Sequence, residues 1–238
     1  MKIKRRSLSS VISILTILSI VLSSSVFADE KPTFNVEPVV GARLVNTVTN
    51  EVIVIDAKDI GKKVRYIQPN NILMRANVPQ DSISMQVEYD VAVKFDANNP
   101  NAAPTVRSGQ SDTTDEWDSS YSVHAYATIN YTIKIINDLY CIRVDSGSVR
   151  WEKDEASIRV LNKSILIGQM GKDEKTRRTV SNTLERAVSG MSASYATNFS
   201  SFLLADDAVY TASTWAICDI QRGTSNTWHF EVNSAANL

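Results

Sequence analysis

The chain has 238 residues, of which 43% are apolar and 21% are charged, with 25 basic residues against 26 acidic residues. This composition is typical of a folded protein and excludes a disordered or collagen-like chain. Four of the basic residues lie within residues 1–28, so the remainder carries a net charge of about −5. A mildly acidic surface lacks the clustered basic footprint that phosphate binding needs, which argues against nucleic acid as a partner.

Residues 1–28 have the three parts of a secretory signal peptide: a basic start at 2–6, an apolar stretch at 11–22, and small or branched residues before a cleavage site after Ala28. The apolar stretch would span about 18 Å as a helix, well short of the roughly 30 Å of a bilayer core. The pair Arg5-Arg6 also fits twin-arginine export, but the aliphatic stretch favours the general route. We therefore expect a secreted, extracellular protein with no stable transmembrane segment after cleavage.

Alternation of apolar and polar residues dominates the rest of the chain. Apolar residues occupy the odd positions of 83–95, and the segment 121–135 repeats the pattern. Strict alternation predicts strands with one buried and one wet face, which is typical of antiparallel sheets. Each segment would extend over more than about 40 Å, so we expect bends or bulges in both. Shorter strands are expected earlier in the chain, at 43–49, 51–55, 63–67 and 72–76.

A meander of short strands follows, with turns predicted at 137–138, 146–147 and 161–163, and a last hairpin joins 214–221 to 227–232. Turn residues every 8 to 12 positions are the pattern of a sandwich or barrel. We predict an all-β, antiparallel β-sandwich, immunoglobulin-like or related, formed by residues 29–238 as one domain. The polar stretch 96–116 reads as a long loop or as a linker that subdivides this domain.

One segment departs from the strand pattern. Val180, Leu184, Val188 and Met191 recur at helical spacing, and Asp173 and Glu174 precede them. This spacing predicts one short helix around residues 174–190, although serine and threonine are frequent there.

Several short motifs carry a resemblance. Trp117-Asp118-Ser119-Ser120-Tyr121 leads into the second long strand, Ser146-Gly147-Ser148 precedes Trp151, and Arg222-Gly223-Thr224-Ser225 precedes Trp228. Together with Gly168-Gln169-Met170-Gly171, they resemble a loose set of small secreted β-rich proteins of Gram-positive bacteria, over residues 82–238. The members of that set have no established activity, so the resemblance implies a compartment and a fold but no functional residues.

Cys141 and Cys218 lie in two predicted strands, and an exported chain can be oxidised. We expect a disulfide between them if their Cα atoms approach within about 6 Å, and it would stabilise the fold by about 4.5 kcal/mol on the loop-closure model. The alternative is two separate buried thiols.

Catalytic and metal motifs are absent from the sequence. There is no G-x-S-x-G elbow, no H-E-x-x-H or C-x-x-C spacing, and no glycine-rich phosphate loop. The two histidines, His124 and His229, fall on polar strand faces. We therefore predict no catalytic residue, no metal ligand and no cofactor.

The wet face of the second long strand offers a candidate ligand surface. His124, Tyr126 and Asn130 alternate there with other short hydrogen-bonding side chains, and an aromatic ring in such a setting can stack on a sugar or a peptide. The leading functional prediction is a secreted, non-enzymatic binding protein whose partner is a cell-wall glycan or another component of a host or bacterial surface.

The sequence also fits two other functions. A cryptic secreted hydrolase would need a histidine that meets a carboxylate and a nucleophile, since a fold alone never excludes chemistry. A β-pore-forming, membrane-active toxin is the other, because 83–95 and 121–135 have the length and alternation of membrane strands.

Overall fold

The computed structural model describes residues 41–67, 82–99, 101–108, 122–207 and 210–236, all of them within the unit Val36–Leu238. The expected signal peptide, the expected strand at 72–76 and part of the polar stretch 96–116 lie outside the described residues.

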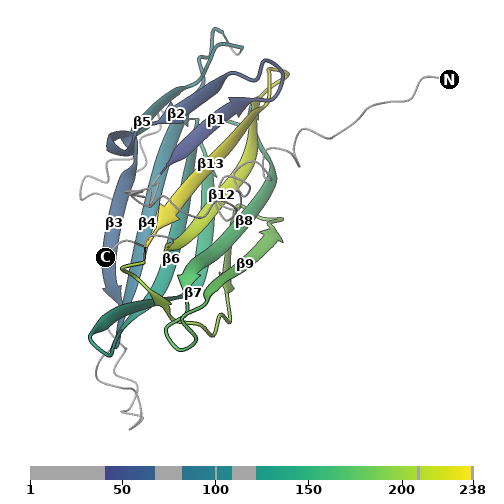
Figure 1. The fold of residues 1–238 in the computed structure, drawn as a ribbon. Helices are drawn as coiled ribbons and strands as arrows, with labels where there is room; N and C mark the ends of the chain where they lie inside the picture. The colour runs from purple at the N-terminus through teal and green to yellow at the C-terminus, as the bar shows by residue number, and fades with distance from the viewer. Residues whose placement is uncertain (1–40, 68–81, 100, 109–121, 208–209, 237–238) are drawn as a thin grey trace, which may run out of the picture. The chain divides into compact units, whose positions relative to one another are not determined.

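Two antiparallel sheets pack face to face, which confirms the predicted all-β sandwich (Figure 1). Sheet A has the strand order β2-β1-β13-β12-β8-β9, and sheet B has the order β10-β7-β6-β4-β3, with β11 beside β7 and β5 beside β4. The strands of sheet A are β1 (Ala42–Asn46), β2 (Val52–Ile55), β8 (Ile158–Lys172), β9 (Thr179–Ala187), β12 (Thr211–Arg222) and β13 (Trp228–Ala235). The strands of sheet B are β3 (Gly61–Ile67), β4 (Ser82–Lys94), β5 (Thr105–Ser108), β6 (Val123–Ile136), β7 (Leu139–Lys153), β10 (Ser192–Ala196) and β11 (Leu203–Leu204). A 3₁₀ turn, η2 (Ala57–Asp59), precedes β3.

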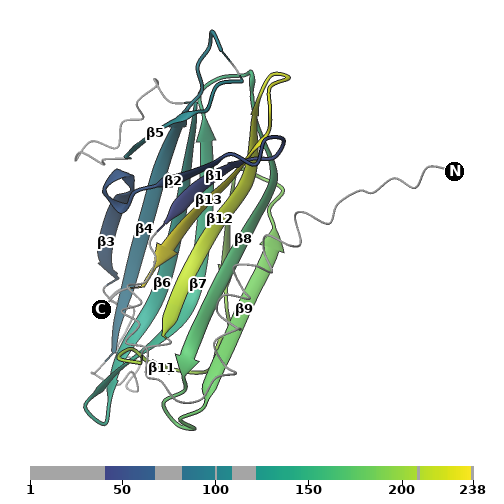
Figure 2. The ribbon, with the colours of Figure 1, turned by 45° about the horizontal axis from the view of Figure 1, so that its top comes forward.

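The core forms where β12 and β13 pack on β4, β6 and β7, as the two views of Figures 1 and 2 show. Most odd residues of β4 and β6 point into it, as the alternation predicted, and their even residues form the outer face of sheet B. The largest fully buried side chains include Trp151, Trp228, Tyr131, Phe95 and Phe230. One contiguous apolar layer therefore leaves two opposite outer faces, on which most of the alternating side chains are polar.

Two predicted turns are wrong, because β7 and β8 each run unbroken through them. The expected turn at Ser146-Gly147 is a register shift within β7, opposite Asn130/Tyr131 of β6. A Cβ on Gly147 would lie 2.6 Å from Thr214 Oγ1 and 2.8 Å from Ile167. The glycine thus allows the sheets to approach closely here, a role that its sequence neighbours do not distinguish from a turn. Residues 161–163 likewise lie within β8, beside a register shift between Ile217 and Asp219 of β12.

The helix expected around residues 174–190 is also wrong, because this segment forms β9, an edge strand of sheet A that pairs with β8. Val180, Leu184 and Val188 are spaced by four residues, an even number that places them on one side of a strand as well as on one side of a helix. The serine and threonine residues between them favour the strand, and pairing with β8 decides the outcome.

The disulfide expected between Cys141 and Cys218 is absent, and both thiols are free and buried. Cys218 of β12 belongs to the core between the sheets. Cys141 belongs to a separate small cluster with Phe202 and Leu204, on the other side of β7 from the core residue Ile142. The alternative of two separate thiols therefore describes the structure. Burial raises the pKa of both thiols.

The two long alternating segments lie side by side, because β4 and β6 pair antiparallel along almost their whole length. Each is also bonded on its other side, β4 to β3 and β5, and β6 to β7. They are central strands of sheet B, and their outer side chains build the surface described next.

Candidate functional site

A chain of polar contacts crosses the outer face of sheet B at one end of β6. His124 Nε2 lies 2.7 Å from Asp90 Oδ2 of β4, and His124 Nδ1 lies 2.8 Å from the Tyr126 hydroxyl. That hydroxyl donates to Glu152 Oε2 of β7 at 3.1 Å. Three neighbouring strands thus hold the Tyr126 side chain in one orientation, and two residues predicted for a ligand surface, His124 and Tyr126, lie together.

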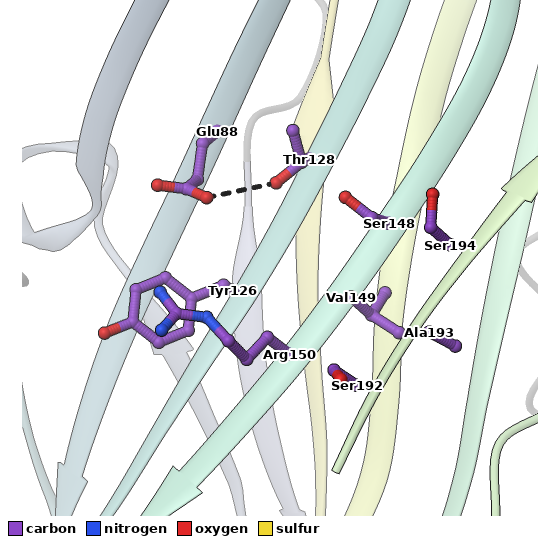
Figure 3. Close-up of a pocket in the computed structure, with 9 residues that line it drawn as sticks. All are labelled: Glu88, Tyr126, Thr128, Ser148, Val149, Arg150, Ser192, Ala193 and Ser194. Carbon is purple, nitrogen blue, oxygen red and sulfur yellow. Dashed lines mark hydrogen bonds between the residues drawn. The ribbon is translucent and has the colours of Figure 1, made fainter. Parts of the chain in front are cut away.

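The ring of Tyr126 is covered by a cation. The guanidinium carbon of Arg150 lies 3.8 Å from the ring centroid (Figure 3). Arg150 also forms an ion pair with Glu152. Burial and the nearby Glu152 carboxylate raise the pKa of Tyr126 well above its usual range. The hydroxyl therefore stays protonated at neutral pH and is not an activated nucleophile.

Asn130, the third predicted residue, lies further along β6 and is held on both sides. Its Oδ1 accepts from Gln86 Nε2 at 2.9 Å, and its Nδ2 donates to Ser146 Oγ at 3.0 Å. Asn130 does not line the depression described below. Its contacts tie three strands together, which is a structural role.

A depression of about 290 Å³ lies beside Tyr126, between β4 and the edge strand β10. Glu88 and Thr128 border it on one side and are joined by a hydrogen bond of 3.2 Å (Figure 3). The lining residues are Glu88, Tyr126, Thr128, Ser148, Val149, Arg150, Ser192, Ala193 and Ser194. Strands from distant parts of the sequence meet here, so the pattern of β6 alone does not predict most of the lining residues.

Three serine hydroxyls in this lining have no hydrogen-bond partner among the described residues: Ser148 on β7, and Ser192 and Ser194 on β10. The register pairs Ser148 directly with Ser194, and Ser192 with Arg150. Each hydroxyl can both donate and accept a hydrogen bond. None of these serines was predicted as a site residue, because β10 follows the expected helix at 174–190 and Ser148 follows the expected turn at 146–147.

Several charges on this face occur in opposite-sign neighbours. Arg143 pairs with Asp145, and Lys63 of β3 lies opposite Glu88 of β4 in the register. With the Arg150–Glu152 and His124–Asp90 contacts, every acidic residue named on this face has a basic or imidazole neighbour.

The other histidine lies on the outer face of sheet A. His229 Nδ1 lies 2.8 Å from Asp219 Oδ1, and His229 Nε2 lies 3.1 Å from Glu231 Oε1. The hydrogen bond to Asp219, and then the one to Glu231, raise the pKa of His229 to about 9 although burial opposes them. Glu231 also pairs with Arg43 at 2.5 Å. Both ring nitrogens therefore carry protons at neutral pH, and His229 cannot act as a general base.

The hydrolase alternative finds no support in these two arrangements. His124 meets a carboxylate and a hydroxyl, but that hydroxyl donates to Glu152, and His229 meets two carboxylates and no nucleophile. Within the described part of the chain, no group of three or more histidine, cysteine, aspartate or glutamate side chains has the arrangement of a metal site. The same part of the chain contains no helix of the length and apolarity needed to cross a bilayer.

Comparison with known proteins gives no match to any protein family, curated protein or solved structure.

Proposed function

We propose that this chain is a non-enzymatic binding module whose outer face of sheet B holds a neutral, hydroxyl-rich ligand, a surface glycan, in the depression beside Tyr126. The observation that carries the proposal is the lining itself: three serine hydroxyls without an intramolecular partner, on β7 and β10, face a depression that Glu88 of β4 borders on its other side. Hydroxyls, a carboxylate and a guanidinium together can donate to and accept from the hydroxyl groups of a sugar.

A neutral ligand fits better than a charged one. An anionic polymer needs a surface with excess positive charge, whereas here Arg150 is paired with Glu152 and Glu88 lies opposite Lys63. Recognition then depends on hydrogen bonds and shape, and polar groups placed at fixed points in a pocket give orientation and specificity.

The geometry changes the role expected for Tyr126. A sugar cannot stack on the ring face that Arg150 occupies, so the guanidinium is the surface presented to the ligand there. Tyr126 positions Arg150, and His124 and Glu152 position Tyr126 in turn. Export, expected from residues 1–28, would bring such a module to the glycans of a cell surface.

Binding of the purified full chain to a panel of neutral and acidic oligosaccharides, by calorimetry, tests the proposal. We expect neutral saccharides to bind, and Glu88→Gln to weaken binding about tenfold, because it replaces a charge-assisted acceptor by a neutral one. Ser181→Ala, on the edge strand of the opposite sheet, is the matched control and should leave binding unchanged. Binding of acidic saccharides alone, or binding that Glu88→Gln does not affect, would contradict the proposal.

A further inference from the structure

The sheets of this sandwich end in strands that differ in how they are protected. The unpaired backbone groups of an edge strand can hydrogen-bond to a strand of another chain. Proteins prevent this pairing with short edge strands, charged residues or proline. Sheet A ends in β2, which has four residues, and β9, which carries Glu185 and Arg186. On the β3 side, sheet B carries Lys62, Lys63 and Arg65.

The opposite edge of sheet B, strand β10, carries no charged residue and no proline, and with five residues it is one residue longer than β2. Its sequence is Ser-Ala-Ser-Tyr-Ala, without charge, proline, glycine or register shift. Ser192, Ser194 and Ala196 are exposed, and among the described residues only β7 pairs with this strand. Strand β10 is thus a regular, uncharged and accessible edge.

The direction of its backbone groups follows from the bonds at its two ends. Trp151 N–H donates to the Met191 carbonyl at 2.8 Å, and Thr197 N–H donates to the Asp145 carbonyl at 2.9 Å. Hydrogen-bonded pairs alternate with non-bonded pairs in an antiparallel ladder, so Ala193 and Tyr195 bond to β7. The N–H and C=O groups of Ser192, Ser194 and Ala196 therefore point away from the sheet, toward the open edge.

We infer that β10 pairs antiparallel with β10 of a second copy of this chain, about a two-fold axis at Ser194. This register places Ser194 opposite Ser194 of the partner subunit, and Ser192 opposite Ala196 of the partner subunit. Each facing pair joins outward N–H and C=O groups through two hydrogen bonds. A two-fold contact needs a self-complementary surface, and small uncharged side chains meet that condition, whereas the charged edges would bring like charges together.

The pairing has a consequence that rests on the proposed function. A two-fold axis perpendicular to the sheet keeps the outer faces of both copies on the same side. Because Ser192 and Ser194 line the depression, the two depressions would lie next to each other along one continuous sheet. Such a dimer would bind a repeating glycan through two sites, with the gain in avidity that linked sites give.

The oligomeric state of the full chain without ligand, measured by sedimentation over a range of concentrations, tests the dimer apart from the glycan proposal. We expect a mass that rises from one copy to two with concentration. Ser194→Pro removes one outward N–H from each copy but no bond to β7, so both hydrogen bonds at the two-fold axis are lost and dimerisation should weaken about 25-fold. Ser194→Ala keeps the N–H and should dimerise like the wild type.

A charge exchange tests the register without altering the backbone. Ser194→Lys and Ser194→Glu each place like charges directly opposite across the axis, so each alone should be monomeric, and their mixture should form a heterodimer. A wild type that stays monomeric at millimolar concentration overturns the inference. A dimer unaffected by Ser194→Pro, or no recovery in the mixture, also overturns it.

Discussion

The outer faces of the two sheets each place a histidine beside acidic residues, yet they differ in what surrounds it. On sheet A, His229 lies between Asp219 and Glu231, Glu231 reaches Arg43, and Asp219 accepts from Asn162 at 2.7 Å. On sheet B, the contacts of His124 lead through Tyr126 to Arg150, beside a depression whose serine hydroxyls have no intramolecular partner among the described residues. Polar side chains that hydrogen-bond to one another hold neighbouring strands together. Exposed hydroxyls that bond to no other part of the chain can bond to a ligand instead of to water.

The largest effect that this comparison predicts is on stability, through sheet A. Glu231→Ala removes a carboxylate that is 5% exposed and leaves Arg43 and His229 without one of their partners. We expect the free energy of unfolding to fall by about 3 kcal/mol, measured by denaturant titration. Glu185→Ala, an exposed acid on the same sheet, should change it by less than about 0.5 kcal/mol. Equal effects of the two substitutions would show that the sheet A cluster has no special structural role.

The same cluster predicts a dependence of stability on pH. The pKa of His229 is about 9 in the folded chain and about 6.5 when unfolded. A raised pKa stabilises the fold fully below about 6.5, and this contribution is lost as the pH rises through about 9. We expect the melting temperature to fall by about 5–10 °C between pH 7 and pH 10 in excess of the fall in His229→Gln. Parallel pH profiles of the two proteins would contradict this assignment.

The acids of the cluster act in the opposite direction at low pH. Burial alone would raise the pKa of Glu231, but hydrogen bonds from His229 and Arg43 outweigh it and the pKa is lowered. Stability from Glu231 is thus present above its unfolded pKa and is lost as the pH falls through the folded value.

On sheet B the expected effect is on binding alone. Ser148→Ala removes one of the unpartnered hydroxyls and should weaken neutral glycan binding about fivefold, the value of one hydrogen bond. Its melting temperature should stay within about 2 °C of the wild type, because no intramolecular hydrogen bond of that hydroxyl is lost. A loss of stability without a loss of binding would place Ser148 with the structural residues of sheet A.

The smallest effect concerns the two cysteines, which lie on opposite sides of sheet B. Treatment with oxidant or reductant should leave the melting temperature unchanged, because both thiols are free and buried. Thiol labelling should proceed only after denaturation, for both residues. A melting temperature lowered by reductant would reveal the disulfide that the structure does not contain.

Strand alternation predicted the sandwich well, since 83–95 and 121–135 match β4 and β6 within a few residues. The errors arose where one pattern fits two structures. A spacing of four fits a strand as well as a helix at β9, and Ser146-Gly147 fits a register shift as well as a turn. The parity of Cys141 with Arg143, against Ile142 and Val144, was a usable sign that this thiol faces away from the core.

The candidate site was predictable only in part. His124 and Tyr126 were visible as polar residues on an alternating strand, and the structure does bring them together. The positions of the β10 serines beside β7, and of the Arg150 guanidinium over the Tyr126 ring, depend on which strands are neighbours. Local periodicity does not show which distant segments pair.

Mapping the backbone amide shifts of the ¹⁵N-labelled chain by NMR during titration with a neutral oligosaccharide tests the central claim most directly. We expect the shifted signals to cluster at Glu88, Thr128, Ser148, Arg150 and Ser192, while those of Asp219, His229 and Glu231 stay in place. Shifts confined to the sheet A cluster, or no shifts with any neutral saccharide, would contradict it.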